Sequence, residues 1–203
     1  MIAPLRISDF SRDFRDWLRY GNPAAMIELA DTGAVALSYD NGDTLVFIQP
    51  LESGWFEVVE QHRRSALPSG TAIFSAASLD LVEKNLIVRH GWAVRRYAGY
   101  AWIPERESRE APAPGTSLRF VDVSGIPVSQ GYTDGLYNSV FDEVVAGGVP
   151  MIRFAGVMGS SLSSAAAASW LIVPSTREVI ESYSHPEGLP LFPLGSPETR
   201  PGI

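Results

Sequence analysis

Near the N-terminus, apolar side chains recur at the spacing of one face of an α-helix. The members of this stripe are Ile7, Phe10, Phe14, Trp17 and Leu18. Charged residues fill the positions between them, so the pattern predicts an amphipathic helix. Ser8 is a suitable N-cap, and Gly21 followed two residues later by Pro23 predicts the end of this helix.

The next segment has the pattern of short β-strands separated by turns. β-type runs occupy residues 26–30, 34–39, 44–49 and 55–61. Asn41-Gly42, between the second and third runs, is a strong hairpin signal. We therefore expect an antiparallel meander of four strands, followed by a short fifth strand at residues 71–75.

Helical and strand-like patterns follow. A helix is predicted from Ser78, with Leu79, Val82 and Leu86 on its buried face and Gly91 as its C-terminal stop. The second half of the chain is less regular. Its pattern predicts a strand at 118–123, a helix at 136–145, a strand at 151–157, a flexible connector at 159–164 and a helix at 176–183.

These elements predict an α+β protein with a mainly antiparallel sheet and a few packed helices, because strands and helices do not alternate strictly. We expect a single domain over residues 1–184. The proline-rich residues 185–203 are expected to form an extended C-terminal tail, and residues 104–115 a linker or mobile loop.

The amino-acid composition excludes several kinds of functional site. The 203 residues carry a formal net charge of −7, which opposes binding to nucleic acid and is compatible with a basic protein as partner, although most acidic proteins have no such partner. The sequence has no cysteine, so disulfides, thiolate nucleophiles and Cys-based metal sites are excluded. No signal peptide or membrane-spanning run is evident, and we expect a cytoplasmic protein that is not attached to a membrane.

No catalytic motif is recognisable. The three histidines lie in separate neighbourhoods without metal-ligand spacing, and no Gly-x-Ser-x-Gly, P-loop or Gly-x-Gly-x-x-Gly motif occurs. We therefore expect no catalytic residue, no cofactor and no bound metal. One alternative stays open: a hydrolase whose carboxylate pair only the fold assembles, with candidate acids at Glu57, Glu60, Asp142 and Glu143.

Two segments are candidates for binding another protein. The turn-rich residues 128–132 place a long amide and an aromatic ring beside a glycine, as Ser129, Gln130 and Tyr132. Such a loop can insert into a partner's cleft. The second candidate is the outer face of the first helix, with Arg12 and Arg15.

Two further segments resemble a known family. Residues 74–86 (FSAASLDLVEKNL), followed by Gly91 and Val94-Arg95, are similar to a helix of the actinobacterial immunity protein 61 family. Residues 181–192 (ESYSHPEGLPLF) resemble that family's closing motif. The family includes immunity factors for NAD(P) glycohydrolases of the tuberculosis-necrotizing-toxin type.

The resemblance implies an antitoxin that forms a 1:1 heterodimer with its toxin domain and blocks the NAD-binding cleft. Such an inhibitor needs a rigid scaffold and a sizeable contact surface, and it needs no catalytic residue. A secretion chaperone or adaptor protein is the alternative among protein-binding roles.

Overall fold

The computed structural model describes residues 3–21, 25–39, 42–62, 70–101, 103, 111–122, 124–125, 140–155 and 161–191. Its strands form one antiparallel sheet in the order β1-β2-β3-β4-β5-β8-β7-β6. The strands are β1 (Ala25–Leu29), β2 (Ala34–Tyr39), β3 (Thr44–Pro50), β4 (Phe56–His62), β5 (Thr71–Ala76), β6 (Thr116–Asp122), β7 (Val140–Ala146) and β8 (Val149–Ala155). The predicted α+β class and the predicted meander of β1 to β4 are both confirmed.

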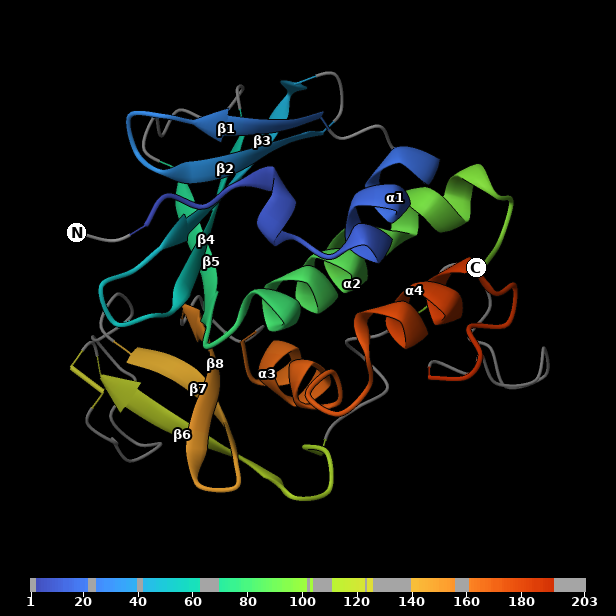
Figure 1. Cartoon of the computed structure of the whole chain (residues 1–203). Helices are drawn as coiled ribbons and strands as arrows, with labels where there is room; N and C mark the ends of the chain where they lie inside the picture. Colours follow the sequence, from blue (N-terminus) through green and yellow to red (C-terminus); the bar gives the residue numbers. More distant parts are fainter. Residues whose placement is uncertain are drawn as a thin grey trace.

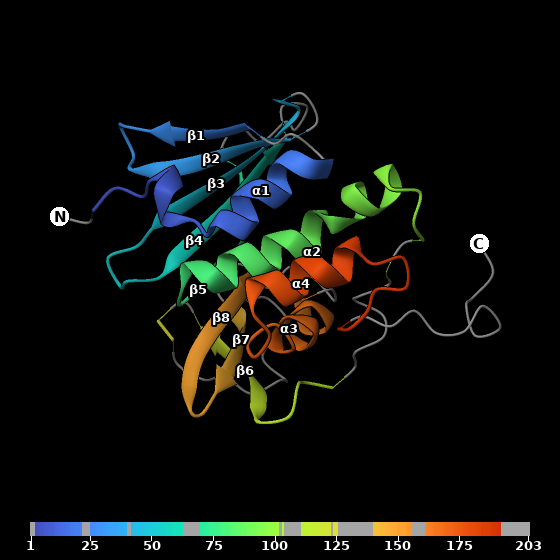
Figure 2. The ribbon, with the colours of Figure 1, turned by 45° about the vertical axis from the view of Figure 1, so that its right-hand side comes forward.

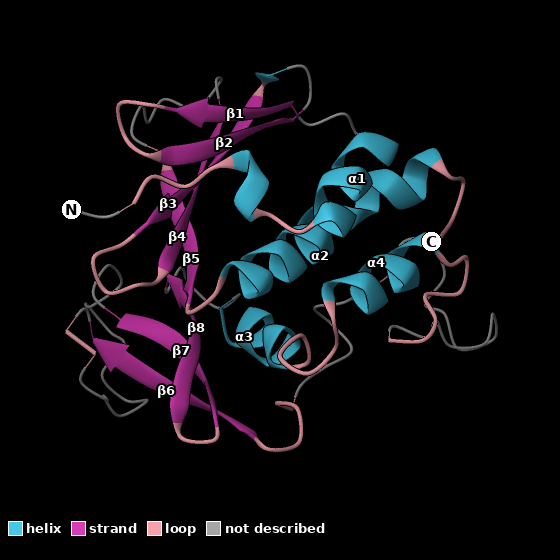
Figure 3. Cartoon of the chain, viewed as in Figure 1, coloured by secondary structure: helices cyan, strands magenta, loops and turns pink. Residues whose placement is uncertain are grey.

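The helices lie together on one side of this sheet (Figures 1 and 2). They are the short 3-10 helix η1 (Ile7–Asp9), α1 (Arg12–Gly21), α2 (Leu79–Tyr97), α3 (Ser161–Ser169) and α4 (Thr176–Ser184). Coloured by secondary structure, the chain shows a strand layer against a helix layer (Figure 3). The core fills the space between the layers, with Val46, Ile48 and Ile152 of the sheet fully buried beside Leu86 and Ile87 of α2.

The sheet consists of two meanders joined at a short seam. Strands β1 to β5 form one meander and β6 to β8 the other. Among the described residues, β5 and β8 pair at only three positions: Phe74 with Phe154, Ser75 with Arg153, and Ala76 with Ile152. The two halves are joined at this seam, with α2 packed on β4 and β5 of one half and α3 packed on the three strands of the other.

The first helix starts later than the sequence pattern suggests. Phe10 has an extended backbone and separates η1 from α1, so the prediction of Ser8 as the N-cap is wrong. Ser11 caps α1 instead, because its Oγ accepts a hydrogen bond from the Phe14 N–H at 3.1 Å. The C-terminal end at Gly21 agrees with the prediction.

Gly91 does not end the second helix, and that prediction is also wrong. α2 continues to Tyr97, while Gly91 lies where α4 crosses it. A Cβ at this position would fall far inside van der Waals contact with the Tyr183 ring. The glycine therefore permits a close approach of two helices and does not terminate one.

Two predictions in the second half are wrong. Val140–Ala146 is strand β7 rather than part of a helix, because it pairs with β6 on one side and β8 on the other. The predicted flexible connector overlaps α3, which begins at Ser161 and contains four consecutive alanines, the best helix formers. The last predicted helix is confirmed as α4, capped by Ser175 and Glu178.

Candidate functional site

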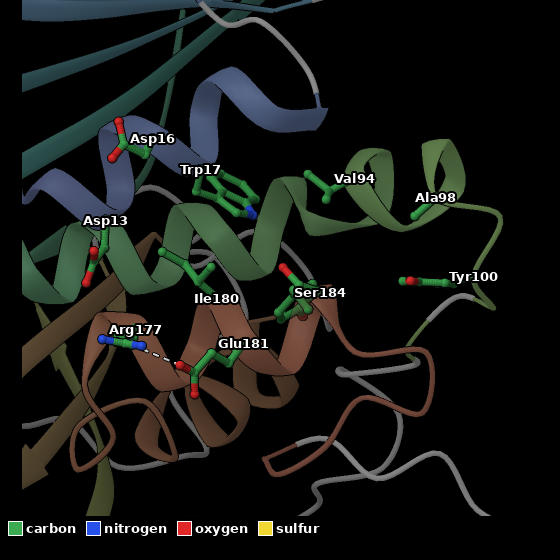
Figure 4. Close-up of a pocket in the computed structure, with 11 residues that line it drawn as sticks. Asp13, Asp16, Trp17, Val94, Ala98, Tyr100, Arg177, Ile180, Glu181 and Ser184 are labelled. Carbon is green, nitrogen blue, oxygen red and sulfur yellow. Dashed lines mark hydrogen bonds and ion pairs between the residues drawn. The ribbon is translucent and has the colours of Figure 1, made fainter.

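A groove of about 470 Å³ opens between α1, the C-terminal half of α2, and α4 (Figure 4). Trp17, Val94 and Ile180 provide apolar surface, while Asp13, Asp16 and Glu181 are acidic. The remaining lining residues are Ala98, Tyr100, Arg177, Tyr183 and Ser184. The groove can receive an apolar or basic side chain of a partner.

Arg177, Glu181 and Asp16 of the groove each have an oppositely charged partner. Arg177 donates from Nε to Glu181 at 2.9 Å, and this hydrogen bond raises the pKa of Arg177. Asp16 lies between Arg12, at 3.4 Å, and Arg19, at 3.6 Å. All these side chains are largely exposed, so their pairing contributes little to stability.

The two arginines predicted to bind a partner occupy different environments on α1. Arg12 is 87% exposed and projects from the helix beside Asp16. Arg15 is half-buried, with its Nε directed at the Ser11 carbonyl at 3.5 Å. Neither arginine lines the groove, although both belong to a helix that forms one of its walls.

The other predicted contact residues, Ser129, Gln130 and Tyr132, lie outside the described residues. Their role as a partner-binding loop stays a prediction. β6 ends at Asp122 and β7 begins at Val140, so the chain segment that carries them leaves and re-enters the sheet at the paired end of these two strands.

A buried carboxylate holds the three helices together at one end. Glu83 of α2 is 1% exposed and accepts hydrogen bonds from both the N–H and the Oγ–H of Ser11, each at 2.6 Å. Thr176, the first residue of α4, donates to Asp80 of α2 at 2.8 Å. Burial raises the pKa of Glu83, which the Ser11 donors partly oppose.

A buried arginine holds the helices at the other end and joins the two family-like segments. Arg95, at 1% exposure, donates to the carbonyls of Ala101, His185 and Pro186, each at 2.7 Å. The segment with Val94-Arg95 therefore binds the segment 181–192 directly. The two family-like segments therefore contribute to the scaffold by binding each other, a role that the sequence motifs alone do not reveal.

The histidines do not gather into a metal site. In the part of the chain that the structure describes, no group of three or more His, Cys, Asp or Glu side chains could hold a metal ion. His62 contacts Thr44 at 3.0 Å and Glu60 at 3.1 Å. His90 stacks on Tyr39 with ring centroids 4.2 Å apart, and burial lowers its pKa to about 4.

The acids considered for a hydrolase do not form a pair in one cleft. Glu57 accepts from Gln49 at 2.5 Å, and Glu60 binds Arg89 at 2.6 Å. Glu143 lies between two arginines, whereas its neighbour Asp142 points to the opposite face of the strand. Three of these carboxylates are thus held by donors and are not placed for shared proton transfer.

The sequence pattern did not indicate that two arginines lie on either side of Glu143. They are Arg119 of β6 and Arg153 of β8, which the register places on neighbouring strands. Each arginine stands between two apolar residues of its strand. Arg119 lies between Leu118 and Phe120, and Arg153 lies between Ile152 and Phe154. The alternation of apolar and charged residues predicts which face of the sheet each arginine occupies. Only the strand order brings the two arginines next to Glu143.

Comparison with known proteins gives one family and one solved structure. The model of the immunity protein 61 family matches residues 17–191. The fold is similar to that of Rv3902c from M. tuberculosis, with a TM-score of 0.70 and 24% identity, covering 94% of this chain and 98% of that chain. No curated protein matches the sequence. No helix of the described residues is long and apolar enough to cross a membrane.

Proposed function

The chain belongs to the immunity protein 61 family, and on that basis we propose that it is the antitoxin of an NAD(P)-glycohydrolase toxin, whose NAD-binding cleft it blocks. The family match over residues 17–191 is the observation that carries this proposal. It confirms the resemblance seen in the two sequence segments. An immunity protein implies a toxin partner, which we propose to be bound in a 1:1 heterodimer in the cytoplasm of an actinobacterial producing cell.

Steric occlusion requires a rigid surface rather than a reactive group. Glu83 and Asp80 of α2 hold α1 and α4 at one end, and Arg95 of α2 holds the chain after α4 at the other, which provides such a body. Three of the four acids considered for a hydrolase, Glu57, Glu60 and Glu143, are bound by Gln49, by Arg89 and by Arg119 with Arg153. These observations favour binding over catalysis by the protein itself.

The direct test is NAD consumption by the purified toxin domain with and without this protein. We expect one equivalent of the protein to abolish turnover. A complex that forms but leaves turnover intact would instead identify a secretion chaperone or adaptor. Undiminished turnover with no complex at excess protein would contradict the proposal.

Alanine variants test the proposed contact residues. We expect Gln130→Ala or Tyr132→Ala to weaken toxin binding by about 2 kcal/mol, the size of an interface hot spot. Ser129→Ala, Arg12→Ala and Arg15→Ala test the flanking loop position and the outer face of α1. Arg19→Ala is the matched control, because it is another exposed arginine of α1 paired with Asp16. Unchanged affinity in all five variants would place the contact elsewhere.

A further inference from the structure

The sheet face turned away from the helices carries a row of polar residues across six strands. Apolar neighbours in the same strands, such as Ile152 and Phe154, face the core, so Arg153 between them faces the other way. The register aligns the row strand by strand as Gln49, Glu57, Ser75, Arg153, Glu143 and Arg119. This face is therefore polar along the whole row.

Two arginines and one carboxylate form one end of this row. Glu143 has a fully buried side chain. Its Oε1 accepts from Arg153 Nε at 2.6 Å, and its Oε2 accepts from Arg119 Nε. We call the two guanidinium groups held by Glu143 the arginine fork.

The fork has unused hydrogen-bond donors. An arginine has five N–H donors, and each of these two uses its Nε toward Glu143. Within the described part of the chain, no further hydrogen bond to either guanidinium is found. The side chains of Arg119 and Arg153 are 39% and 32% exposed, so a partner can reach their terminal N–H groups.

A tryptophan adjoins the fork. The guanidinium carbon of Arg153 lies 4.8 Å from the centre of the Trp55 ring, which is a cation–π contact. Trp55 precedes β4, so its ring approaches from the other meander. Tryptophan and arginine are the residue types enriched among the energetically dominant positions of protein interfaces.

One of the two arginines is sufficient to neutralise the charge of Glu143. A single guanidinium balances one buried carboxylate, and the second leaves an excess positive charge at this point of a chain whose net charge is −7. A planar guanidinium with free terminal N–H groups matches the geometry of a carboxylate, which it binds through two parallel hydrogen bonds. The fork thus has the charge and geometry to receive a second carboxylate from outside.

We propose that the arginine fork, with Trp55 beside it, receives an aspartate or glutamate side chain of the toxin. This proposal rests on the proposed function and adds to it a second contact surface, on the sheet face opposite the α1–α2–α4 groove. The carboxylate of the toxin would lie across the terminal N–H groups of Arg119 and Arg153. The Trp55 ring would exclude water from one side of this contact.

The double variant Arg119→Lys/Arg153→Lys tests the fork. Lysine keeps the positive charges that Glu143 requires but lacks the planar pair of terminal N–H groups. We expect its affinity for the toxin domain to fall roughly tenfold or more, as loss of charge-assisted bidentate contacts implies. Urea unfolding of the free variant checks that the fold is retained.

Arg89→Lys is the matched control. Arg89 is also half-exposed, at 30%, and also binds a glutamate, Glu60, but it lies on α2. We expect Arg89→Lys to bind the toxin domain as tightly as the unchanged protein. Equal affinity of the double variant and the Arg89→Lys control would overturn the fork proposal and leave the proposed function intact.

A second experiment tests the arginine fork in the absence of the toxin. The side-chain N–H signals of Arg119 and Arg153 are followed by NMR during titration with an acetylated, amidated triglutamate peptide, and separately with inorganic phosphate. We expect the peptide to shift both signals in the unchanged protein, and to shift the remaining arginine signal less when the other arginine is replaced by lysine. Signals that respond to phosphate but not to the peptide would overturn the proposal of a carboxylate ligand, whatever the toxin experiment shows.

Discussion

At the residue scale, the stacked rings of Tyr39 and His90 predict how stability depends on pH. Tyr39 and His90 stack, and neither the Tyr39 hydroxyl nor His90 Nε2 has a hydrogen-bond partner in the described structure. Burial is the main cause that lowers the pKa of His90 to about 4, with the Arg89 charge adding to it and Glu60 opposing it. Burial also raises the pKa of Tyr39.

This arrangement predicts a loss of stability at mildly acidic pH. The unfolded chain takes up a proton at His90 near pH 6.5 and the folded chain only near pH 4, so stability falls as the pH drops between these values. The full difference corresponds to about 3 kcal/mol. His90→Phe keeps the stacked ring and should remove this part of the slope, measured by urea unfolding at pH 7, 5.5 and 4.5.

Comparing His90→Phe with the unchanged protein also separates the contribution of His90 to the pH dependence of stability from that of Glu83. The raised pKa of Glu83 gives the opposite slope, because the folded state then binds a proton more readily than the unfolded state. Both proteins contain Glu83, so its contribution cancels in the difference. The same slope in His90→Phe and in the unchanged protein would show that His90 does not titrate as expected.

At the element scale, the crossing of α2 and α4 depends on one glycine. Gly91→Ala places a methyl group into the ring of Tyr183, a residue with a fully buried side chain. We expect a loss of about 3 kcal/mol in the free energy of unfolding, as for overpacked cores. A double-mutant cycle with Tyr183→Ala measures the clash, because the double variant should cost less than the sum of the single changes. Additive costs would contradict a direct contact.

The elements also show how far the sequence predicts the fold. Local signals succeed where the cause is local: Ser78 caps α2, the helix predicted at residues 176–183 is α4, and the first meander follows its turns. They fail where distant partners decide, as at Val140–Ala146, whose apolar spacing suits a helix but which pairs on both edges. Gly91 is a similar case, since the Tyr183 that requires it is far away in the sequence.

The candidate site could be predicted only in part for the same reason. The sequence places Arg12 and Arg15 on the outer face of the first helix, but neither lines the groove, and their contact with a partner stays a prediction. The groove draws its lining from α1, α2 and α4, and the arginine fork draws its residues from β6, β7 and β8. No spacing within one segment indicates that these side chains meet.

At the scale of the whole molecule, the chain beyond α4 takes part in the fold. His185 and Pro186 provide carbonyl acceptors for the buried Arg95, and Leu191 packs against the core. The family match likewise extends to residue 191. The separate tail predicted for residues 185–203 thus begins with residues that contact the domain, and its boundary stays a prediction that truncation can test.

Two shortened chains make that test. A chain ending at Ser184 leaves buried donors of Arg95 without acceptors, and we expect it to lose about 3 kcal/mol of stability. A chain ending at Leu191 keeps these contacts and should unfold at the same urea concentration as the full chain. If the two truncated chains are equally stable, the boundary at residue 184 predicted from the sequence is correct.

The seam between β5 and β8 couples the binding of a partner to folding. Trp55 belongs to one half of the sheet and Arg153 to the other, so their contact spans the junction. Any transient separation of the halves would pull the aromatic ring away from the guanidinium. A partner that binds both together, as proposed for the toxin, favours the closed sheet, and by thermodynamic reciprocity its binding makes separation of the halves less favourable. In the proposed complex, the protein would thus be more resistant to unfolding than it is alone.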